Sequence, residues 1–282
     1  PAETSNIKQV HITTLGSPSS FGDLAAAKSR AFGGASSTTR GVAMGGNPGH
    51  DLHAFEFASK GNAADFGDES VTRDQATSVS SSTRGICGGG DVPATAQNIL
   101  DYMTITTTGN STDFGDLSIA RAHPAAVSSS TRAIWAGGGA PGNPAKDEID
   151  YVTIASTGDA TDFGDLAAVR LQVSGCASGT RGVFFGGYYY DSPNHDDTIQ
   201  YITMSSTGNT TDFGNLTTAT RNGAAVSNST RGLFAGGVQP TRVNTIEYVT
   251  IASTGNATDF GDMPAATDGA GAYHDAGGGL QN

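Results

Sequence analysis

The sequence predicts an all-β protein: a six-bladed β-propeller with four-stranded blades, formed by a single domain over residues 1–282. Three observations predict this fold: the composition, a sixfold internal repeat, and the division of each repeat into four short strands. Of the 282 residues, 40 are Gly and only 15% are charged, which is too glycine-rich and charge-poor for a helical bundle. The glycines do not recur at every third position, as collagen requires, and 36% of the residues are hydrophobic, enough for a buried core.

A Phe-Gly-Asp or Phe-Gly-Asn tripeptide recurs six times along the chain. Successive copies are separated by 45, 48, 49, 50 and 47 residues. A Thr-Arg pair and a double glycine follow the same period, and a unit of about 48 residues with four strands is typical of a propeller blade. The repeated phenylalanines are Phe21, Phe66, Phe114, Phe163, Phe213 and Phe260.

The fifth unit shows how the four strands are identified. Strand a (223–227) is small and apolar, and a Ser/Asn turn separates it from strand b (232–236), which has a bulky apolar centre and leads into the double glycine. Strand c (245–252) alternates apolar and polar residues, as a half-buried strand does. A Ser-Thr-Gly-Asn turn then leads to strand d, which contains Asp259 and Phe260.

The two ends of the chain each match half of a blade. Residues 7–12 and 21–24 match strands c and d, whereas residues 269–273 and 277–280 match strands a and b. We therefore expect the N-terminal strands c and d to pair with the C-terminal strands a and b. This pairing would close the ring as a sixth blade and leave no open sheet edge.

The charge and the cysteines exclude several classes of function. The formal net charge is −12, so the chain lacks the basic surface that nucleic acids and anionic membranes require. No apolar stretch approaches about 18 residues, the length that predicts a membrane-spanning helix. Cys87 and Cys176 fall in different kinds of strand and in no metal-ligand pattern, so we expect buried free thiols rather than a disulfide. We expect no nucleic-acid partner and no membrane insertion.

The order of motifs within each unit resembles the kelch repeat. A double glycine follows an apolar strand, and then come a Tyr, an aromatic residue and a segment like Leu-x-x-Ala-Arg. Phenylalanine stands where kelch repeats usually have Trp, and the first two copies have Gln9 and Ala54 in place of the tyrosine. The resemblance covers essentially the whole chain and implies a kelch-like propeller. The matching residues are the tyrosines Tyr102, Tyr151, Tyr201 and Tyr248 and the late arginines Arg73, Arg121, Arg170 and Arg221.

The repeat also resembles repeat proteins encoded by marine bacteriophages. The residues that carry this resemblance are TIASTGNATDFGD (250–262) together with the recurrent SSTRG string. The resemblance implies a virion-associated structural or host-contacting protein, located on a virion or outside the cell, rather than a metabolic enzyme. Its expected partners are other virion proteins or a glycan of the host surface.

The polar residues of the repeat form no catalytic pattern. No G-x-S-x-G, HExxH or P-loop motif is present, and the six histidines are scattered among different repeats. We expect the Asp-Phe-Gly-Asp carboxylates and the repeated arginines to form hydrogen bonds and ion pairs within a blade. Calcium binding by paired aspartates such as Asp162 and Asp165 is the alternative, although the sequence has no Asp-x-Asp-x-Asp-Gly loop. We therefore expect no catalytic residue, no metal and no cofactor, with a propeller glycosidase or oxidase as the less favoured alternative.

Ligand binding is expected on the face that carries the loops between strands b and c. The a–b and c–d turns hardly vary among the units, whereas the b–c loops differ completely. A constant scaffold with divergent loops is typical of a binding platform; neutral drift of the loops is the other interpretation. The longest such loop, 188–198, holds three of the eight tyrosines, whose rings suit sugars and protein contacts. The candidate ligand-binding residues are Tyr188, Tyr189, Tyr190, Asp191, His195 and Asp196.

Together these observations predict a non-enzymatic, virion-associated structural or adhesion propeller that contacts a host surface glycan or another virion protein. A secreted carbohydrate-binding lectin unrelated to a virion is the alternative. Five Asn-x-Ser/Thr sequons occur, and three of them fall in the c–d turn. We attribute these to turn chemistry rather than to glycosylation.

Overall fold

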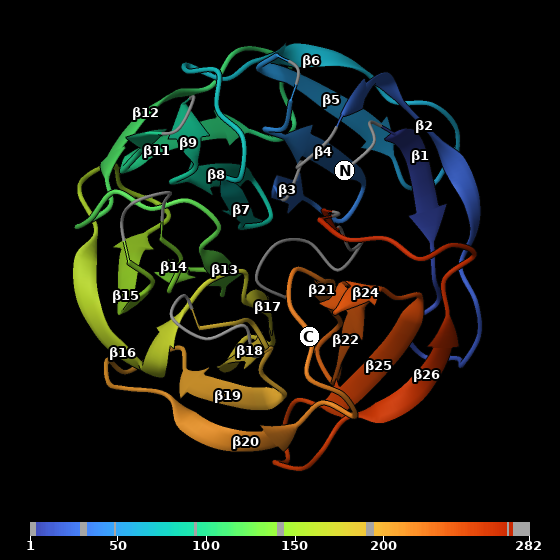
Figure 1. The fold of residues 1–282 in the computed structure, drawn as a ribbon. Coiled ribbons are helices and arrows are strands. Elements are labelled where there is room, and N and C mark those ends of the chain that lie inside the picture. Colours follow the sequence, from blue (N-terminus) through green and yellow to red (C-terminus); the bar gives the residue numbers. More distant parts are fainter. Residues whose placement is uncertain are drawn as a thin grey trace.

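The protein is an all-β propeller, as the sequence predicts. In this computed structural model every regular element of the described residues is a β-strand. Small sheets form a ring about a central axis, with one strand of each sheet nearest the axis (Figure 1). Among these residues no helix is long and apolar enough to cross a membrane. The structure describes residues 4–28, 33–47, 49–92, 95–139, 144–189, 195–269 and 271–272.

Five of the sheets are four-stranded antiparallel blades, and each runs outward from the axis in chain order. Blade 1 comprises β3 (Gly33–Ser36), β4 (Arg40–Met44), β5 (Asp51–Glu56) and β6 (Ala64–Asp68). Blade 2 comprises β7 (Thr77–Ser80), β8 (Arg84–Gly88), β11 (Ile99–Thr104) and β12 (Thr112–Asp116). Blade 3 comprises β13 (Ala125–Ser128), β14 (Arg132–Ala136), β15 (Lys146–Thr153) and β16 (Thr161–Arg170). Blade 4 comprises β17 (Ser174–Ala177), β18 (Arg181–Phe185), β19 (Thr198–Thr203) and β20 (Thr211–Asn215), and blade 5 comprises β21 (Ala224–Ser227), β22 (Arg231–Ala235), β25 (Thr245–Thr250) and β26 (Thr258–Asp262).

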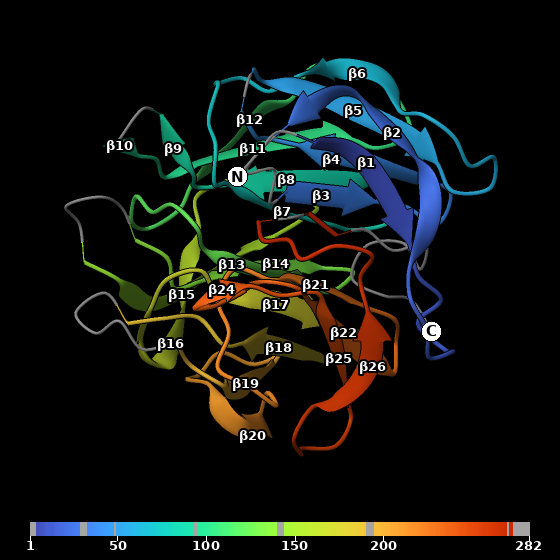
Figure 2. The ribbon, with the colours of Figure 1, turned by 45° about the vertical axis from the view of Figure 1, so that its right-hand side comes forward.

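Short hairpins lie in two of the b–c loops. In blade 2, β9 (Asp91–Val92) pairs with β10 (Thr95–Ala96), and in blade 5, β23 (Val238–Gln239) pairs with β24 (Thr241–Arg242). The β9–β10 hairpin stands out from the ring in the turned view (Figure 2). The b–c loops therefore differ in structure from blade to blade, and not only in sequence.

The prediction of six four-stranded blades is wrong, because the described residues form five. The N-terminal strands β1 (Thr4–Gln9) and β2 (Ser19–Lys28) form a two-stranded sheet, and no described residue adds a third strand to it. The expected partners at the C-terminus fall on residues 269–280: of these, 269, 271 and 272 carry no strand, and the rest lie outside the described residues. The sequence offers a physical reason, since the final double glycine follows His274-Asp275-Ala276 and not the bulky apolar residues that each strand b buries.

The β1–β2 sheet nevertheless lies in the ring between blade 5 and blade 1. On one side, Nη1 of Arg231 in blade 5 donates a hydrogen bond to the Ile12 carbonyl at 3.0 Å. On the other side, the Gly61 amide of blade 1 donates to the Phe21 carbonyl at 3.1 Å. Val10 and Ile12 also pack against the apolar core of blade 5. The two strands therefore link the first and last complete blades.

The glycine of five of the six Phe-Gly-Asp or Phe-Gly-Asn tripeptides is required by the close approach of the neighbouring sheet, namely Gly22, Gly67, Gly115, Gly164 and Gly214. A Cβ atom built on Gly164 would lie 2.5 Å from the carbonyl oxygen of Gly208 in the c–d turn of the next blade. Gly164 also has a φ of 145°, which side chains disfavour. Beside this contact, blades 2 to 5 each pack a Tyr ring edge-on against the tripeptide Phe, as with Tyr201 and Phe213, whose ring centroids are 6.0 Å apart. The sequence motif that defines the repeat is thus the point where blades meet.

Candidate functional site

On the face formed by the a–b and c–d turns, hereafter the turn face, repeated side chains are committed to contacts between blades. In blade 3, the guanidinium carbon of Arg132 lies 4.8 Å from the ring centroid of Tyr151, and its Nη1 donates to the Met204 carbonyl of blade 4 at 3.0 Å. The c–d turns add a second contact, in which Asn209 Oδ1 accepts a hydrogen bond from the Asp165 amide of the previous blade at 3.1 Å. The same two contacts recur in other blades through Arg84, Arg181 and Arg231 and through Asn62, Asn110, Asp159 and Asn256.

Three of the late arginines form buried ion pairs that join consecutive blades. Arg121, which follows β12 of blade 2, donates from Nη2 to Asp150 Oδ2 in β15 of blade 3 at 2.5 Å, and both side chains are at most 1% exposed. Burial lowers the pKa of the Arg121 guanidinium, and the Asp150 carboxylate opposes this shift. The expectation that the arginines pair within a blade is therefore wrong for this set. Arg73 forms the equivalent pair with Asp101 (3.0 Å), whereas Arg170 pairs with Asp196 of the b–c loop of blade 4 (2.6 Å).

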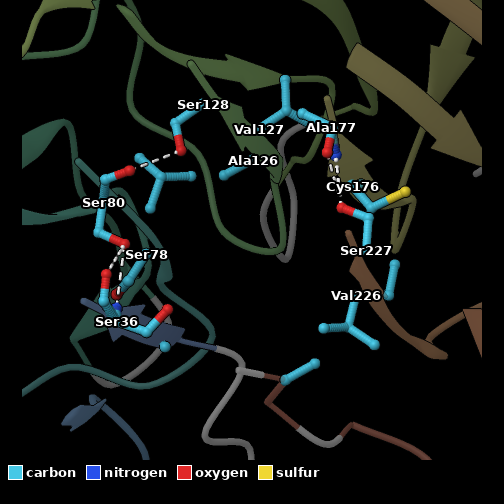
Figure 3. Close-up of a pocket in the computed structure, with 15 residues that line it drawn as sticks. Ser36, Ser78, Ser80, Ala126, Val127, Ser128, Cys176, Ala177, Val226 and Ser227 are labelled. Carbon is cyan, nitrogen blue, oxygen red and sulfur yellow. Dashed lines mark hydrogen bonds between the residues drawn. The ribbon is translucent and has the colours of Figure 1, made fainter. Parts of the chain in front are cut away.

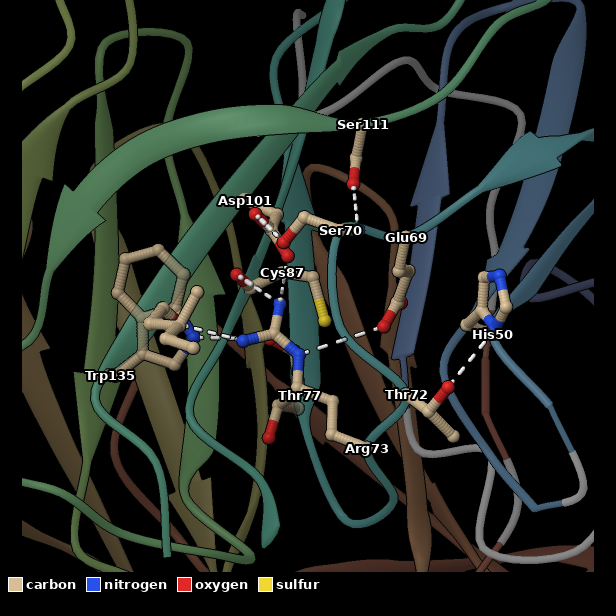
Figure 4. A network of polar contacts seen from close by, with 11 residues as sticks. His50, Glu69, Ser70, Thr72, Arg73, Thr77, Cys87, Asp101, Ser111 and Trp135 are labelled. Atoms are coloured by element: carbon tan, nitrogen blue, oxygen red, sulfur yellow. Dashed lines mark hydrogen bonds and ion pairs between the residues drawn. The ribbon is translucent and has the colours of Figure 1, made fainter. Parts of the chain in front are cut away.

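The Arg73 pair carries a second carboxylate, Glu69, that has no counterpart in the other blades (Figure 4). Glu69 Oε2 lies 3.6 Å from Arg73 Nε, and the Glu69 side chain is 0% exposed. No hydrogen bond of good geometry reaches its oxygens within the described part of the chain, although the Cys87 thiol and the Gly45 amide lie close enough to lower its pKa. Burial raises the pKa of Glu69, and Arg73 opposes the shift. At the same position the next three repeats have buried leucines, namely Leu117, Leu166 and Leu216.

Arg221 does not occupy the buried arginine site, although the sequence suggested that it matches the late arginines. Thr220, which is only 1% exposed, occupies that site. The backbone shows the equivalence, because the carbonyl oxygens of Thr220 and Arg170 accept the same hydrogen bond, from the second glycine of the double glycine, at 3.0 and 2.9 Å. The segments after the tripeptide have the same length in the two repeats, so the arginine of this repeat comes one position later and takes the place that Leu171 holds in the preceding repeat.

In this displaced position Arg221 lies among partly exposed side chains of the b–c loop of blade 4. Its guanidinium carbon is 4.7 Å from the ring centroid of Tyr188. Its Nε donates to His195 Nε2 at 3.1 Å, and its Nη1 donates to Gln172 Oε1 at 2.6 Å. Burial and the nearby Arg221 cation both lower the pKa of His195. We call Arg221, Tyr188, His195 and Gln172 the Arg221 cluster.

The remaining predicted ligand-binding residues divide into two groups. Asp196 is buried, and its Oδ2 pairs with Arg170 and accepts a hydrogen bond from the Tyr189 hydroxyl at 3.1 Å. Tyr189 and Asp196 therefore hold the base of the loop against Arg170 of blade 3. In this blade Gln200 occupies the strand position of Asp150, so Asp196 supplies the carboxylate instead. Tyr190 and Asp191 lie outside the described residues.

The axis of the ring is lined by small residues of the innermost strands (Figure 3). Ser80 Oγ donates to the Ser36 carbonyl at 3.0 Å, and Ser128 Oγ donates to the Ser80 carbonyl at 2.9 Å, so the hydroxyls serve contacts between blades. Two cavities, each of about 80 Å³, lie along this lining. Pockets for drug-sized ligands usually measure about 300–1,000 Å³. Neither of these two cavities, as the described residues form them, reaches that size.

The described residues form neither a metal-binding group nor a reactive thiol. Across the described ranges no three His, Cys, Asp or Glu side chains are grouped as a metal site. Cys87 and Cys176 are free and buried, and burial raises the pKa of both thiols to about 12, which leaves them un-ionised. The Arg221 cluster is a group of polar side chains on the b–c face that none of the repeated contacts between blades explains.

No protein-family model and no curated protein sequence matches the chain. The propeller fold therefore stands on the arrangement of the sheets. The kelch and bacteriophage resemblances remain hypotheses from the sequence.

Proposed function

We propose that the protein is a non-enzymatic, kelch-like binding propeller that contacts its partner through the b–c loop face. The observation that carries the proposal is the difference between the two faces of the ring. The turn face repeats the same inter-blade contacts at each junction between two complete blades, so its polar side chains hold the scaffold together. The b–c loops instead have a different structure in each blade, with hairpins β9–β10 and β23–β24 in two of them and the Arg221 cluster in a third.

The partner that we propose is a glycan of a host surface or, failing that, another virion protein. The bacteriophage resemblance supports a virion-associated role. The Arg221 cluster supports a glycan, because an aromatic ring beside hydrogen-bonding side chains suits a sugar ring. Tyr188 and His195 remain candidate contact residues in this proposal, and Arg221 joins them. A secreted lectin unrelated to a virion would use the same face and differ only in its biological context.

A matched pair of variants tests which face binds. Thr95→Glu with Thr241→Glu places two glutamates on exposed b–c hairpins, and Thr157→Glu with Thr207→Glu places two on exposed c–d turns. Both double variants change the net charge equally. The measurement is binding of the purified chain and both variants to a panel of bacterial surface polysaccharides, neutral and acidic.

The proposal expects the wild type to bind a member of the panel, the b–c variant to bind it at least tenfold more weakly, and the turn-face variant to bind like the wild type. Weaker binding by the turn-face variant alone would place the site on the opposite face. Absence of binding across the panel would refute the glycan and leave a protein partner, which co-purification with virion proteins would test.

A further inference from the structure

Arg221 is a partly exposed cation without a carboxylate partner in the described part of the chain. Each of the three buried late arginines has a carboxylate oxygen within 3.0 Å of a guanidinium nitrogen. No carboxylate of the described residues lies within 4.0 Å of the Arg221 guanidinium, whose protein acceptors are the neutral atoms Gln172 Oε1 and His195 Nε2. A partly buried charge without a counter-charge is costly, and a ligand anion would offset that cost.

Three acids of the neighbouring loops and strands already have other partners. Asp196 pairs with Arg170, and Asp268 pairs with Arg242 and accepts a hydrogen bond from Asn222. In β25, Glu247 lies at the strand position that supplies the partner of Arg121 in blade 3, but it accepts hydrogen bonds from the amide and hydroxyl of Thr217. The displacement by one residue thus separates Arg221 from the carboxylate that the repeat would have provided.

The Arg221 guanidinium is held in place and keeps N–H donors that no protein acceptor uses in the described part of the chain. Of its five N–H donors, Nε serves His195 and one N–H of Nη1 serves Gln172, which leaves one on Nη1 and two on Nη2. Parallel N–H groups of this kind match the two oxygens of a carboxylate. The Tyr188 ring beside the guanidinium fixes its position, so little side-chain freedom remains to be lost on binding.

We propose that Arg221 binds the carboxylate of an acidic sugar, with Tyr188 and His195 contacting the sugar ring. This inference rests on the proposed function and names the class of glycan: a polysaccharide that contains uronic or similar sugar acids. A sugar is favoured over an acidic peptide because Tyr188, His195 and Gln172 surround the cation with an aromatic ring and neutral hydrogen-bonding groups, which suit hydroxyl-bearing rings. The net charge of −12 opposes long-range attraction of an anion, so recognition acts at contact range.

The test uses polygalacturonate, alginate and hyaluronan, each beside its carboxyl-reduced form, which has the same backbone without the charge. Poly-glutamate serves as a carboxylate from a peptide. Binding is measured for the wild type, Arg221→Gln and Arg242→Gln. The last variant is the matched control, because Arg242 is a half-exposed arginine of the same face that already pairs with Asp268. Thermal melts confirm that the variants are folded.

We expect the wild type to bind at least one acid form, to bind its reduced form about 10- to 100-fold more weakly, and to lose the same factor on Arg221→Gln but not on Arg242→Gln. Equal binding of acid and reduced forms, binding of neutral polysaccharides alone, or unchanged binding by Arg221→Gln would overturn the carboxylate inference while the proposed function stands. Equal binding of poly-glutamate would overturn the commitment to a sugar. Failure to bind any polysaccharide, charged or neutral, would overturn this inference and the glycan of the proposed function together, and would leave a protein partner.

Discussion

Replacing Glu69 by leucine should stabilise the protein. The Glu69 side chain is fully buried in a place where Leu117 and Leu166 are 2% and 3% exposed, and its only ion-pair contact is the 3.6 Å approach to Arg73 Nε. The substitution would retain the Arg73–Asp101 pair, as in the neighbouring Arg121–Asp150 arrangement. Removing a poorly paired buried charge is worth about 1–4 kcal/mol, and burying a leucine adds apolar contact. We expect a gain of about 2–4 kcal/mol in the free energy of unfolding at pH 8, or about 4–8 °C in Tm.

The pH dependence of that gain tests the cause. Because burial raises the folded-state pKa of Glu69 above 4.5, its contribution to stability is greatest below that pH and is lost as pH rises through the raised pKa. The advantage of Glu69→Leu should therefore be smaller at pH 4 than at pH 8. Urea unfolding followed by fluorescence of Trp135, the one tryptophan, which is 0% exposed, measures both values. The control Leu166→Glu should destabilise. A Glu69→Leu variant no more stable than the wild type at pH 8, or a gain that does not change with pH, would refute the reasoning.

Three further predictions follow from the contacts between blades. Gly164→Ala should cost about 1–3 kcal/mol more than Gly208→Ala, because both glycines have positive φ but only a Cβ on Gly164 would meet a neighbouring carbonyl, at 2.5 Å; urea unfolding of both variants measures the difference. Arg121→Met should destabilise by about 3–5 kcal/mol by leaving Asp150 buried without its partner, and adding Asp150→Leu should recover most of the loss; equal stabilities of the single and double variants would contradict this ion-pair account. The Cys87 thiol, with its pKa raised to about 12, should react with a thiol reagent in the native protein only as fast as the protein unfolds; rapid labelling at pH 8 would contradict its burial.

The repeat made most of the fold predictable, because one tripeptide carries both the periodicity and the closest contact between blades. The four strands of the fifth unit were located to within a few residues, and blades 1 to 5 follow the same pattern. The sixth blade was not correctly predicted. The double glycine near the C-terminus matched the motif, but the bulky apolar residues that precede it in the other repeats are missing. A glycine pair alone was too weak a signal for a strand.

The candidate site was less predictable, because it depends on a shift of one residue. Arg221 looks like the other late arginines in sequence, yet it lies nine residues after Asp212, whereas Arg170 lies eight after Asp162. This difference in spacing was the sequence signal that Arg221 does not occupy the buried arginine site. The loop that holds Tyr188 and His195 was identified from its length and tyrosines, but the use of Asp196 by Arg170 needed the packing of two blades. Contacts between residues in consecutive repeats cannot be read from the pattern within one repeat.

Hydrogen–deuterium exchange of the full chain, with and without the polysaccharide bound most tightly in the panel, tests the central claim most directly. The claim is that the b–c face, and in it the Arg221 cluster, contacts the partner. It predicts slower exchange on binding in the b–c loops, including residues 188–198, and unchanged exchange in the c–d turns such as 156–159. Slower exchange confined to the c–d turns, with the b–c loops unchanged, would contradict it.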